Sequence, residues 1–166
     1  MAIEGRPPPE GNMVELTDAL RRTLGAFVTL YRHGELRGCI GRMQYDTPLW
    51  RNVIESACSS ALNDPRFLPV TAEEIAGLHI EISVLDEPEP IERLEQFDVS
   101  QHGIVMELGF DHGVFLPKVA REYGWDRPKT LTMLCRKIGL HDHAWLETQA
   151  RFKVFRAREF AETCST

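Results

Sequence analysis

The sequence lacks any pair of cysteines at CxxC spacing. Its four cysteines stand at positions 39, 58, 135 and 164, and their spacing matches neither a zinc ribbon nor a disulfide framework. Reduced thiols in the cytoplasm are therefore expected. Low-complexity tracts and internal repeats are also lacking, which excludes solenoid architectures and favours an ordinary folded domain.

A surplus of basic residues is missing as well. The 166 residues contain 25 acidic and 19 basic side chains, a net charge of -6. Affinity for nucleic-acid phosphates comes from many lysine and arginine contacts, so nucleic-acid binding is not the expected function. One local basic strip keeps an RNA interface open as a weaker alternative: Arg151, Lys153, Arg156 and Arg158.

No apolar run of signal-peptide length occurs near the start of the chain. Residues 1–12 carry charges and a Pro7-Pro8-Pro9 run, so neither secretion nor membrane insertion is expected. We predict that residues 1–12 form a flexible tail, that residues 13–160 form one domain with two lobes, and that residues 161–166 form a polar tail.

What the chain does contain is a mixture of strand and helix patterns. Residues 26–31 and 36–40 are apolar runs around His33-Gly34, which predicts a hairpin, and residues 104–108 and 114–116 predict a second one. Residues 78–85 alternate apolar and polar side chains as a strand with one dry face does. A last strand is expected between residues 145 and 155.

Four segments have the spacing of helices. Residues 13–24 suggest a short amphipathic helix, and Thr47 should cap a helix over residues 48–62 with one apolar stripe that includes Cys58. Residues 117–123 and 130–138 predict two more, and Cys135 should pack inside the second. The combined pattern predicts an α+β fold: a mostly antiparallel sheet with flanking helices, in a larger and a smaller lobe.

The candidate functional residue is Cys39, which lies between Gly38 and Gly41 at the end of an apolar run. Glycines allow another chain or a ligand to approach closely, so the thiol could be presented at a surface. The alternative is a buried thiol that acts as a small hydrophobic side chain. The sequence alone leaves both interpretations open.

A second candidate group lies on the strand at 78–85. Alternation places His79, Glu81 and Ser83 on one face, where a histidine beside a carboxylate could act in acid-base chemistry. A solvated polar face of an antiparallel sheet is the competing interpretation. The sequence His141-Asp142-His143 offers only two imidazoles, which indicates a surface loop more than a metal site.

Taken together, several blocks of the sequence resemble the AMMECR domain family, also called AmmeMemoRadiSam system protein A. The blocks are residues 25–30, 36–41, 64–67, 80–85 and 116–120, and Trp125. The resemblance covers about residues 13–160 and implies an α+β fold of two lobes. It implies no defined reaction and no cofactor. His141 stands where relatives tend to have proline, so the histidine pair is not a family motif, and no metal site is predicted.

The resemblance also implies partners. Genes of the family often lie beside those of a Memo-like protein and a radical S-adenosylmethionine enzyme. The chain itself has no CxxxCxxC sequence for an iron-sulfur cluster, so it is not that radical enzyme. We predict a binding or accessory subunit of a modification pathway.

Two functional hypotheses follow. The first is a binding module that presents residues 36–41 together with the 64–67 segment; its binding residues would be Arg37, Gly38, Gly41, Arg66 and Phe67. The second is a cysteine-dependent enzyme or group-transfer subunit. In it Cys39 would be the nucleophile, Arg37 or Arg66 would lower its pKa, and Glu81, His79 or Asp64 would act as acid or base.

Overall fold

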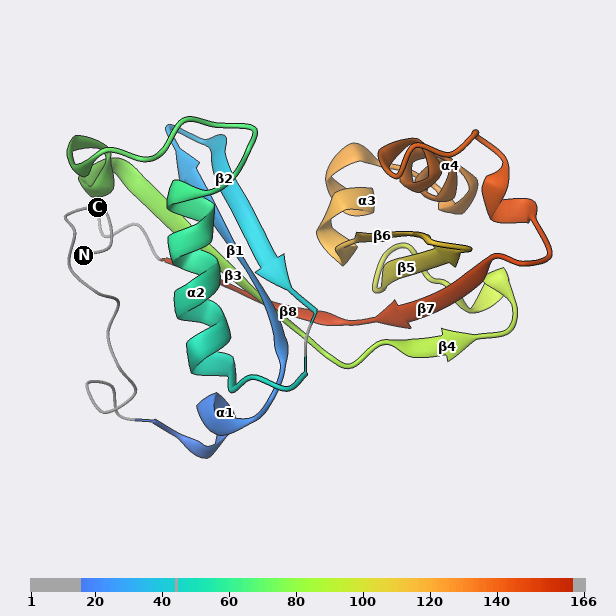
Figure 1. Cartoon of the computed structure of the whole chain (residues 1–166), viewed down its shortest axis with the longest axis horizontal. Coiled ribbons are helices and arrows are strands. Elements are labelled where there is room, and N and C mark those ends of the chain that lie inside the picture. Colours follow the sequence, from blue (N-terminus) through green and yellow to red (C-terminus); the bar gives the residue numbers. More distant parts are fainter. Residues whose placement is uncertain (1–15, 44, 163–166) are drawn as a thin grey trace. The chain divides into compact units, whose positions relative to one another are not determined.

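The computed structural model describes residues 16–43 and 45–162 (Figure 1). The chain divides into two compact units. Unit 1 contains the chain up to Leu85 and returns at Arg158, and unit 2 runs from Asp86 to Ala157. Each unit contains one four-stranded sheet. Helices and strands therefore mix in the way expected of an α+β protein.

The sheet of unit 1 has the strand order β2-β1-β3-β8, so β2 is an edge strand. Strands β1 (Gly25–Arg32) and β2 (Glu35–Arg42) form the predicted hairpin. His33 and Gly34 both have positive φ, 53° and 81°, as the tight turns that join hairpin strands require. Strand β3 (Leu78–Leu85) pairs with the other side of β1, and the prediction for residues 78–85 is confirmed.

Helix α2 (Leu49–Leu62) covers one face of β1 and β2. Its start differs from the prediction, because Pro48 is the N-cap residue and Thr47 makes no capping bond. The Leu49 amide instead donates to the Arg22 carbonyl at 2.8 Å. A partner from an earlier segment thus supplies what a Thr47 hydroxyl would have supplied.

The buried face of α2 is more polar than predicted. Leu49, Asn52, Ser56 and Ser60 are its buried residues, whereas Cys58 is only partly buried. These small polar side chains have local partners: the Asn52 amide donates to the Leu24 carbonyl at 3.0 Å and the Ser60 hydroxyl to the Val28 carbonyl at 2.7 Å. Satisfied hydrogen bonds let a polar face lie against a sheet at little cost.

The apolar core of unit 1 lies between α2 and the sheet. Val28, Leu30 and Val70 are buried there. Partly buried apolar side chains complete it: Val53, Ala57, Ala61, Leu78, Ile80 and Ile82. Because side chains alternate along a strand, the residues between these on β1 and β3 occupy the opposite face.

Short elements complete unit 1. Helix α1 (Asp18–Arg21) occupies only part of the predicted 13–24 segment, and residues 1–15 lie outside the described part of the chain. The 3-10 helix η3 (Ala72–Gly77) begins after Thr71. Strand β8 (Ala157–Ala161) was not predicted, and it includes Ala161, the first residue of the expected polar tail. Residues 163–166 of that tail are not described.

Unit 2 has the strand order β4-β7-β5-β6. Strands β5 (Gly103–Leu108) and β6 (Asp111–Phe115) form the second predicted hairpin, and β4 (Glu89–Ile91) and β7 (Arg151–Phe155) complete the sheet. Helices α3 (Pro117–Tyr123) and α4 (Arg127–Lys137) lie on one side of it in Figure 1. The 3-10 turns are η4 (Leu94–Gln96) and η5 (Ala144–Leu146).

Helix α4 begins three residues earlier than predicted. The Asp126 side chain accepts from the Lys129 amide at 2.8 Å and Pro128 occupies the first turn. The helix therefore starts within the segment that the prediction left between residues 123 and 130. Cys135 is fully buried among Met106, Leu131 and Leu134, and its predicted packing role is confirmed. Burial raises the pKa of its thiol.

Candidate functional site

Three candidate side chains form a row across the sheet of unit 1. Thr29 on β1 pairs with Cys39 on β2 and with Glu81 on β3. The Thr29 hydroxyl lies 3.3 Å from the Cys39 sulfur. Neighbouring strands are about 4.8 Å apart, so a whole strand separates Cys39 from Glu81. The row lies on the sheet face opposite α2.

The predicted grouping of polar side chains on β3 is present, but one of them does not fit the competing interpretation of a solvated polar face. His79, Glu81 and Ser83 share the face of this row, and the first two are partly buried. Ser83 is only 1% exposed, and its hydroxyl has no hydrogen-bond partner among the residues that the structure describes. The face is therefore not simply a polar surface in water.

The most constrained candidate is Asp64, in the segment after α2. Only 2% of its side-chain surface is exposed. Its carboxylate accepts four hydrogen bonds: from the Cys39 amide at 2.8 Å, the Arg66 amide at 3.1 Å, and the Arg66 Nε and Nη2 at 2.9 and 2.7 Å. We call Asp64, Arg66 and the backbone of Cys39 the edge cluster.

The edge cluster supplies hydrogen-bond partners for one residue of the edge strand. Because β2 is the edge strand, backbone groups that point away from β1 have no strand to pair with. Asp64 takes the Cys39 N–H, and Arg66 Nη2 donates to the Cys39 carbonyl at 3.3 Å. Both edge groups of Cys39 are thus satisfied by side chains.

The same hydrogen bonds determine the charge state of Asp64. The Arg66 guanidinium, followed by the Cys39 and Arg66 amides, holds the pKa of the Asp64 carboxyl far below its usual range, although burial opposes this. A carboxylate that remains ionised and has all these donors in place cannot accept a proton near neutral pH. The predicted acid-base role of Asp64 therefore does not fit this geometry.

Arg37 is turned toward a different carboxylate. Its Nε and Nη2 donate to Glu74 of η3 at 2.9 and 3.0 Å, and its Nη1 donates to the Leu68 carbonyl at 2.9 Å. Glu74 also accepts from Arg32 at 3.0 Å and from the Thr71 amide at 2.8 Å. With its guanidinium so engaged, Arg37 fits a structural role better than the predicted lowering of the Cys39 pKa.

Gly38 and Gly41 allow close approach, but the approach is by the protein itself. A Cβ on Gly38 would lie 2.1 Å from the Ser60 carbonyl oxygen, and one on Gly41 would lie 2.2 Å from the Phe27 ring. The missing side chain at Gly38 thus lets helix α2 pack directly on β2, whereas Gly41 makes room for Phe27 of β1. These contacts explain both glycines without a ligand, and their predicted binding role stays a prediction.

Phe67 is partly buried, and its ring lies 5.5 Å from the Arg66 guanidinium carbon, a cation–π distance. Ser60 and Glu74 were missed as supporting residues. Ser60 accepts from the Ile40 amide at 2.8 Å, and only its spacing along α2 hinted at contact with the strand. Glu74 lies in η3, and its contact with Arg37 was not predicted.

Other chemistry has little support in the described ranges. Within residues 16–43 and 45–162 there is no group of three His, Cys, Asp or Glu side chains that could hold a metal ion. His141 instead contacts Glu147 at 2.9 Å. No helix in this part of the chain is both long enough and apolar enough to cross a membrane.

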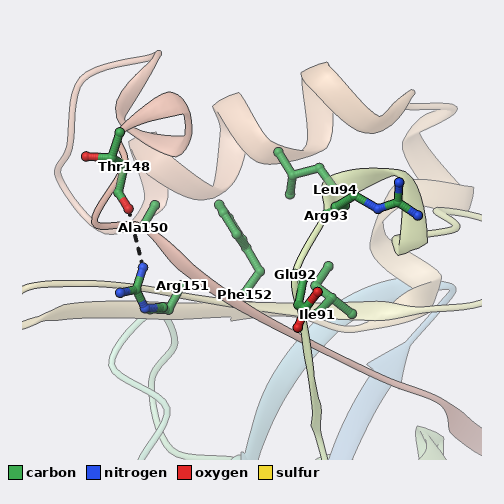
Figure 2. A pocket seen from close by; sticks show the side chains of 8 residues that line it. All are labelled: Ile91, Glu92, Arg93, Leu94, Thr148, Ala150, Arg151 and Phe152. Carbon is green, nitrogen blue, oxygen red and sulfur yellow. Dashed lines mark hydrogen bonds between the residues drawn. The ribbon is translucent and has the colours of Figure 1, made fainter.

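A separate pocket of about 410 Å³ lies in unit 2 (Figure 2). Residues 91–94 and Thr148, Ala150, Arg151 and Phe152 line it. Figure 2 shows Leu94 and Phe152 near its middle, with the guanidinium groups of Arg93 and Arg151 toward opposite sides. All the predicted site residues lie in unit 1, so the pocket is a distinct feature that the sequence did not indicate.

Carboxyl groups with a lowered pKa predict a loss of stability in acid, and two of them lie at this site. Arg37, with the Thr71 amide, lowers the pKa of Glu74 to about 2, and Asp64 is lowered as described. Unfolded carboxyls titrate near 4, so the unfolded chain binds these protons first. Their stabilisation is complete above about pH 5 and is lost as the pH falls toward 2.

Urea unfolding between pH 7 and pH 3 measures this loss. Glu74→Gln should give a flatter dependence of the free energy of unfolding on pH than the parent chain, because one of the carboxyl groups with a lowered pKa is gone. Glu73→Gln is the matched control, since Glu73 is a neighbouring exposed acid of the same helix. An unchanged slope for Glu74→Gln would contradict the assignment.

The chain is similar in sequence and in structure to known proteins. The AMMECR1 family profile matches residues 2–160. A protein of Methanothermobacter thermautotrophicus is 40% identical over 154 residues, covering 89% of this chain and 80% of that protein. One of Methanocaldococcus jannaschii is 42% identical over 146 residues, covering 83% and 73%. The crystal structure of an uncharacterized Pyrococcus horikoshii protein has a TM-score of 0.85 at 37% identity, covering 95% of this chain and 80% of that one.

Proposed function

The chain belongs to the AMMECR1 family, and from that premise we propose that it is a non-catalytic binding or accessory subunit that presents the surface around the edge cluster to a protein partner. These relatives are uncharacterised, so they give the family no established activity. We propose further that residues 13–160 act as one domain of two lobes and that the protein works in the cytoplasm.

One observation carries this proposal. The charged residues of the edge cluster are used to fix the backbone of Cys39: the Asp64 carboxylate has four donors, and the Arg66 guanidinium bridges to the Cys39 carbonyl. A catalytic acid or base needs a lone pair or proton directed at a substrate. A rigid, charge-neutral surface suits recognition instead, because little entropy is lost when it binds.

The proposed partners are the Memo-like protein and the radical S-adenosylmethionine enzyme that the family resemblance implies. Nucleic acid is a weaker candidate. In the basic strip, Lys153 pairs with Glu107 at 2.8 Å and Arg151 contacts the Thr148 carbonyl at 3.3 Å. Cations already engaged with protein groups contribute less to phosphate binding.

Association in solution tests the proposal. The chain should bind at least one of the two proposed partners, measured by calorimetry with purified proteins. Cys39→Ser should change the affinity by less than about twofold, because the edge cluster uses the backbone of residue 39 and not its sulfur. Absence of binding by the parent chain would contradict the proposed function.

The thiol supports a second candidate function. Cys39 is partly buried, its sulfur lies 3.3 Å from the Thr29 hydroxyl, and Arg66 is held at its carbonyl. A cysteine-dependent enzyme or group-transfer subunit would need a reactive thiolate there. Rapid alkylation of Cys39 at pH 7, together with loss of pathway turnover but not of partner binding in Cys39→Ser, would favour this function.

A further inference from the structure

The loop of residues 65–69, which we call the 65–69 loop, is held at both ends. At its start the buried Asp64 carboxylate is bound to the Cys39 amide. At its end Val70 is only 2% exposed, and its amide donates to the Ala61 carbonyl at 2.8 Å. The loop therefore leaves and re-enters the body of unit 1 at fixed points.

The middle of the loop is fixed as well. Arg37 Nη1 donates to the Leu68 carbonyl at 2.9 Å, and the rest of that guanidinium is bound by Glu74. Pro65 and Pro69 restrict the backbone further, because proline fixes φ. A loop with this many constraints has a single defined backbone conformation.

This rigid loop exposes an apolar side chain. Leu68 has 84% of its surface free, while Pro65 and Pro69 beside it are also exposed. None of the bonds that hold the loop uses the Leu68 side chain; they use its carbonyl oxygen. The fold therefore gains nothing from a leucine here, and a polar residue would serve equally well.

We propose that Leu68 is the central contact of the binding surface and that it inserts into an uncharged apolar pocket on a folded protein partner. This inference rests on the proposed binding function and adds the contact residue and the chemistry of the partner. A segment that is held in one conformation before binding loses little conformational entropy when it binds, so more of the contact energy of Leu68 remains for affinity.

Charge and shape favour a protein pocket over other occupants. Each of the arginines around the loop, Arg32, Arg37 and Arg66, contacts the carboxylate of Glu74 or Asp64. These guanidinium groups therefore offer less to phosphate or to an anionic membrane than unpaired ones would. A side chain that protrudes with most of its surface free cannot enclose a small molecule. A complementary pocket should be apolar and should lack net charge.

Calorimetric binding to the purified Memo-like protein and the radical S-adenosylmethionine enzyme tests this inference with Leu68→Asp. We expect affinity for the bound partner to fall at least about 30-fold, since a charge would enter an apolar pocket. Leu146→Asp is the matched control, because Leu146 is 62% exposed and lies in unit 2. The affinity of the Leu146→Asp variant for the same partner should differ from that of the parent chain by less than about twofold. Both variants should keep the parent thermal midpoint, because both sites are exposed.

The outcomes separate the two proposals. Binding by the parent chain that is equal in Leu68→Asp would overturn this inference and leave the proposed function in place. No binding by the parent chain would overturn both. Self-association that light scattering detects in the parent chain and that Leu68→Asp abolishes would overturn the choice of partner, because the occupant would then be a second copy of this chain.

Discussion

Replacing Asp64 by asparagine is expected to lower the free energy of unfolding by about 2–4 kcal/mol, the usual cost of breaking one side of a buried, hydrogen-bonded charge pair. The amide keeps the volume of the carboxylate but has only one acceptor oxygen. Its NH₂ group must face an N–H group of Cys39 or of Arg66 that now donates to the Asp64 carboxylate. At least one buried donor then loses its partner.

The substitution Arg66→Gln removes the exposed member of the ion pair and leaves the buried member, Asp64, in place. Arg66 has 53% of its side-chain surface exposed, against 2% for Asp64, so its loss leaves the Cys39 amide bond to the carboxylate in place. We expect a smaller loss than for Asp64→Asn. Urea unfolding at pH 7 measures both, and an equal or larger loss for Arg66→Gln would contradict this expectation.

The fold was predictable wherever the signal was local. The alternation along residues 78–85 and the turn at His33-Gly34 are set by side-chain period and by positive φ, both of which depend on near neighbours. The start of α4 was missed because its local signal has two possible meanings. The side chain of Asp126 could end one helix or cap the next, and only the position of the chain beyond Gly124 decides between the two.

Elements that depend on distant partners were less predictable. Strand β8 shows no alternation of burial, and most of its residues are exposed; it joins the sheet because β3 offers an open side, as in the bond from the Glu162 amide to the Ile80 carbonyl at 3.1 Å. The start of α2 at Leu49 depends similarly on a distant partner, the Arg22 carbonyl. Such partners cannot be read from a local pattern.

The contacts among the candidate residues were predictable only in part, and their role in a site stays a prediction. The family resemblance grouped Cys39 with Asp64 and Arg66, and the structure brings these three together. It also directs Arg37 to Glu74 and leaves Thr29 between Cys39 and Glu81. The difference arises because strand order decides which neighbours a side chain has, and strand order is a property of the whole sheet.

Replacing Gly38 by alanine should be strongly destabilising. An added Cβ would lie 2.1 Å from the Ser60 carbonyl oxygen, and this atom belongs to the backbone of α2, which cannot turn aside as a side chain can. Overpacking usually costs 1–3 kcal/mol and occasionally more, so we expect a loss of about 3 kcal/mol or more. That is a large share of the about 5–15 kcal/mol that stabilises a typical domain.

Gly77→Ala is the matched control, because the nearest atom to a Cβ there, Arg32 Nε, is 4.0 Å away and φ is not positive. Urea unfolding followed by circular dichroism should show little change for Gly77→Ala and a much lower midpoint for Gly38→Ala. If Gly38→Ala were as stable as the parent chain, α2 could not be packed directly on β2. Gly38 would then be free for the close approach of a partner that the sequence first suggested.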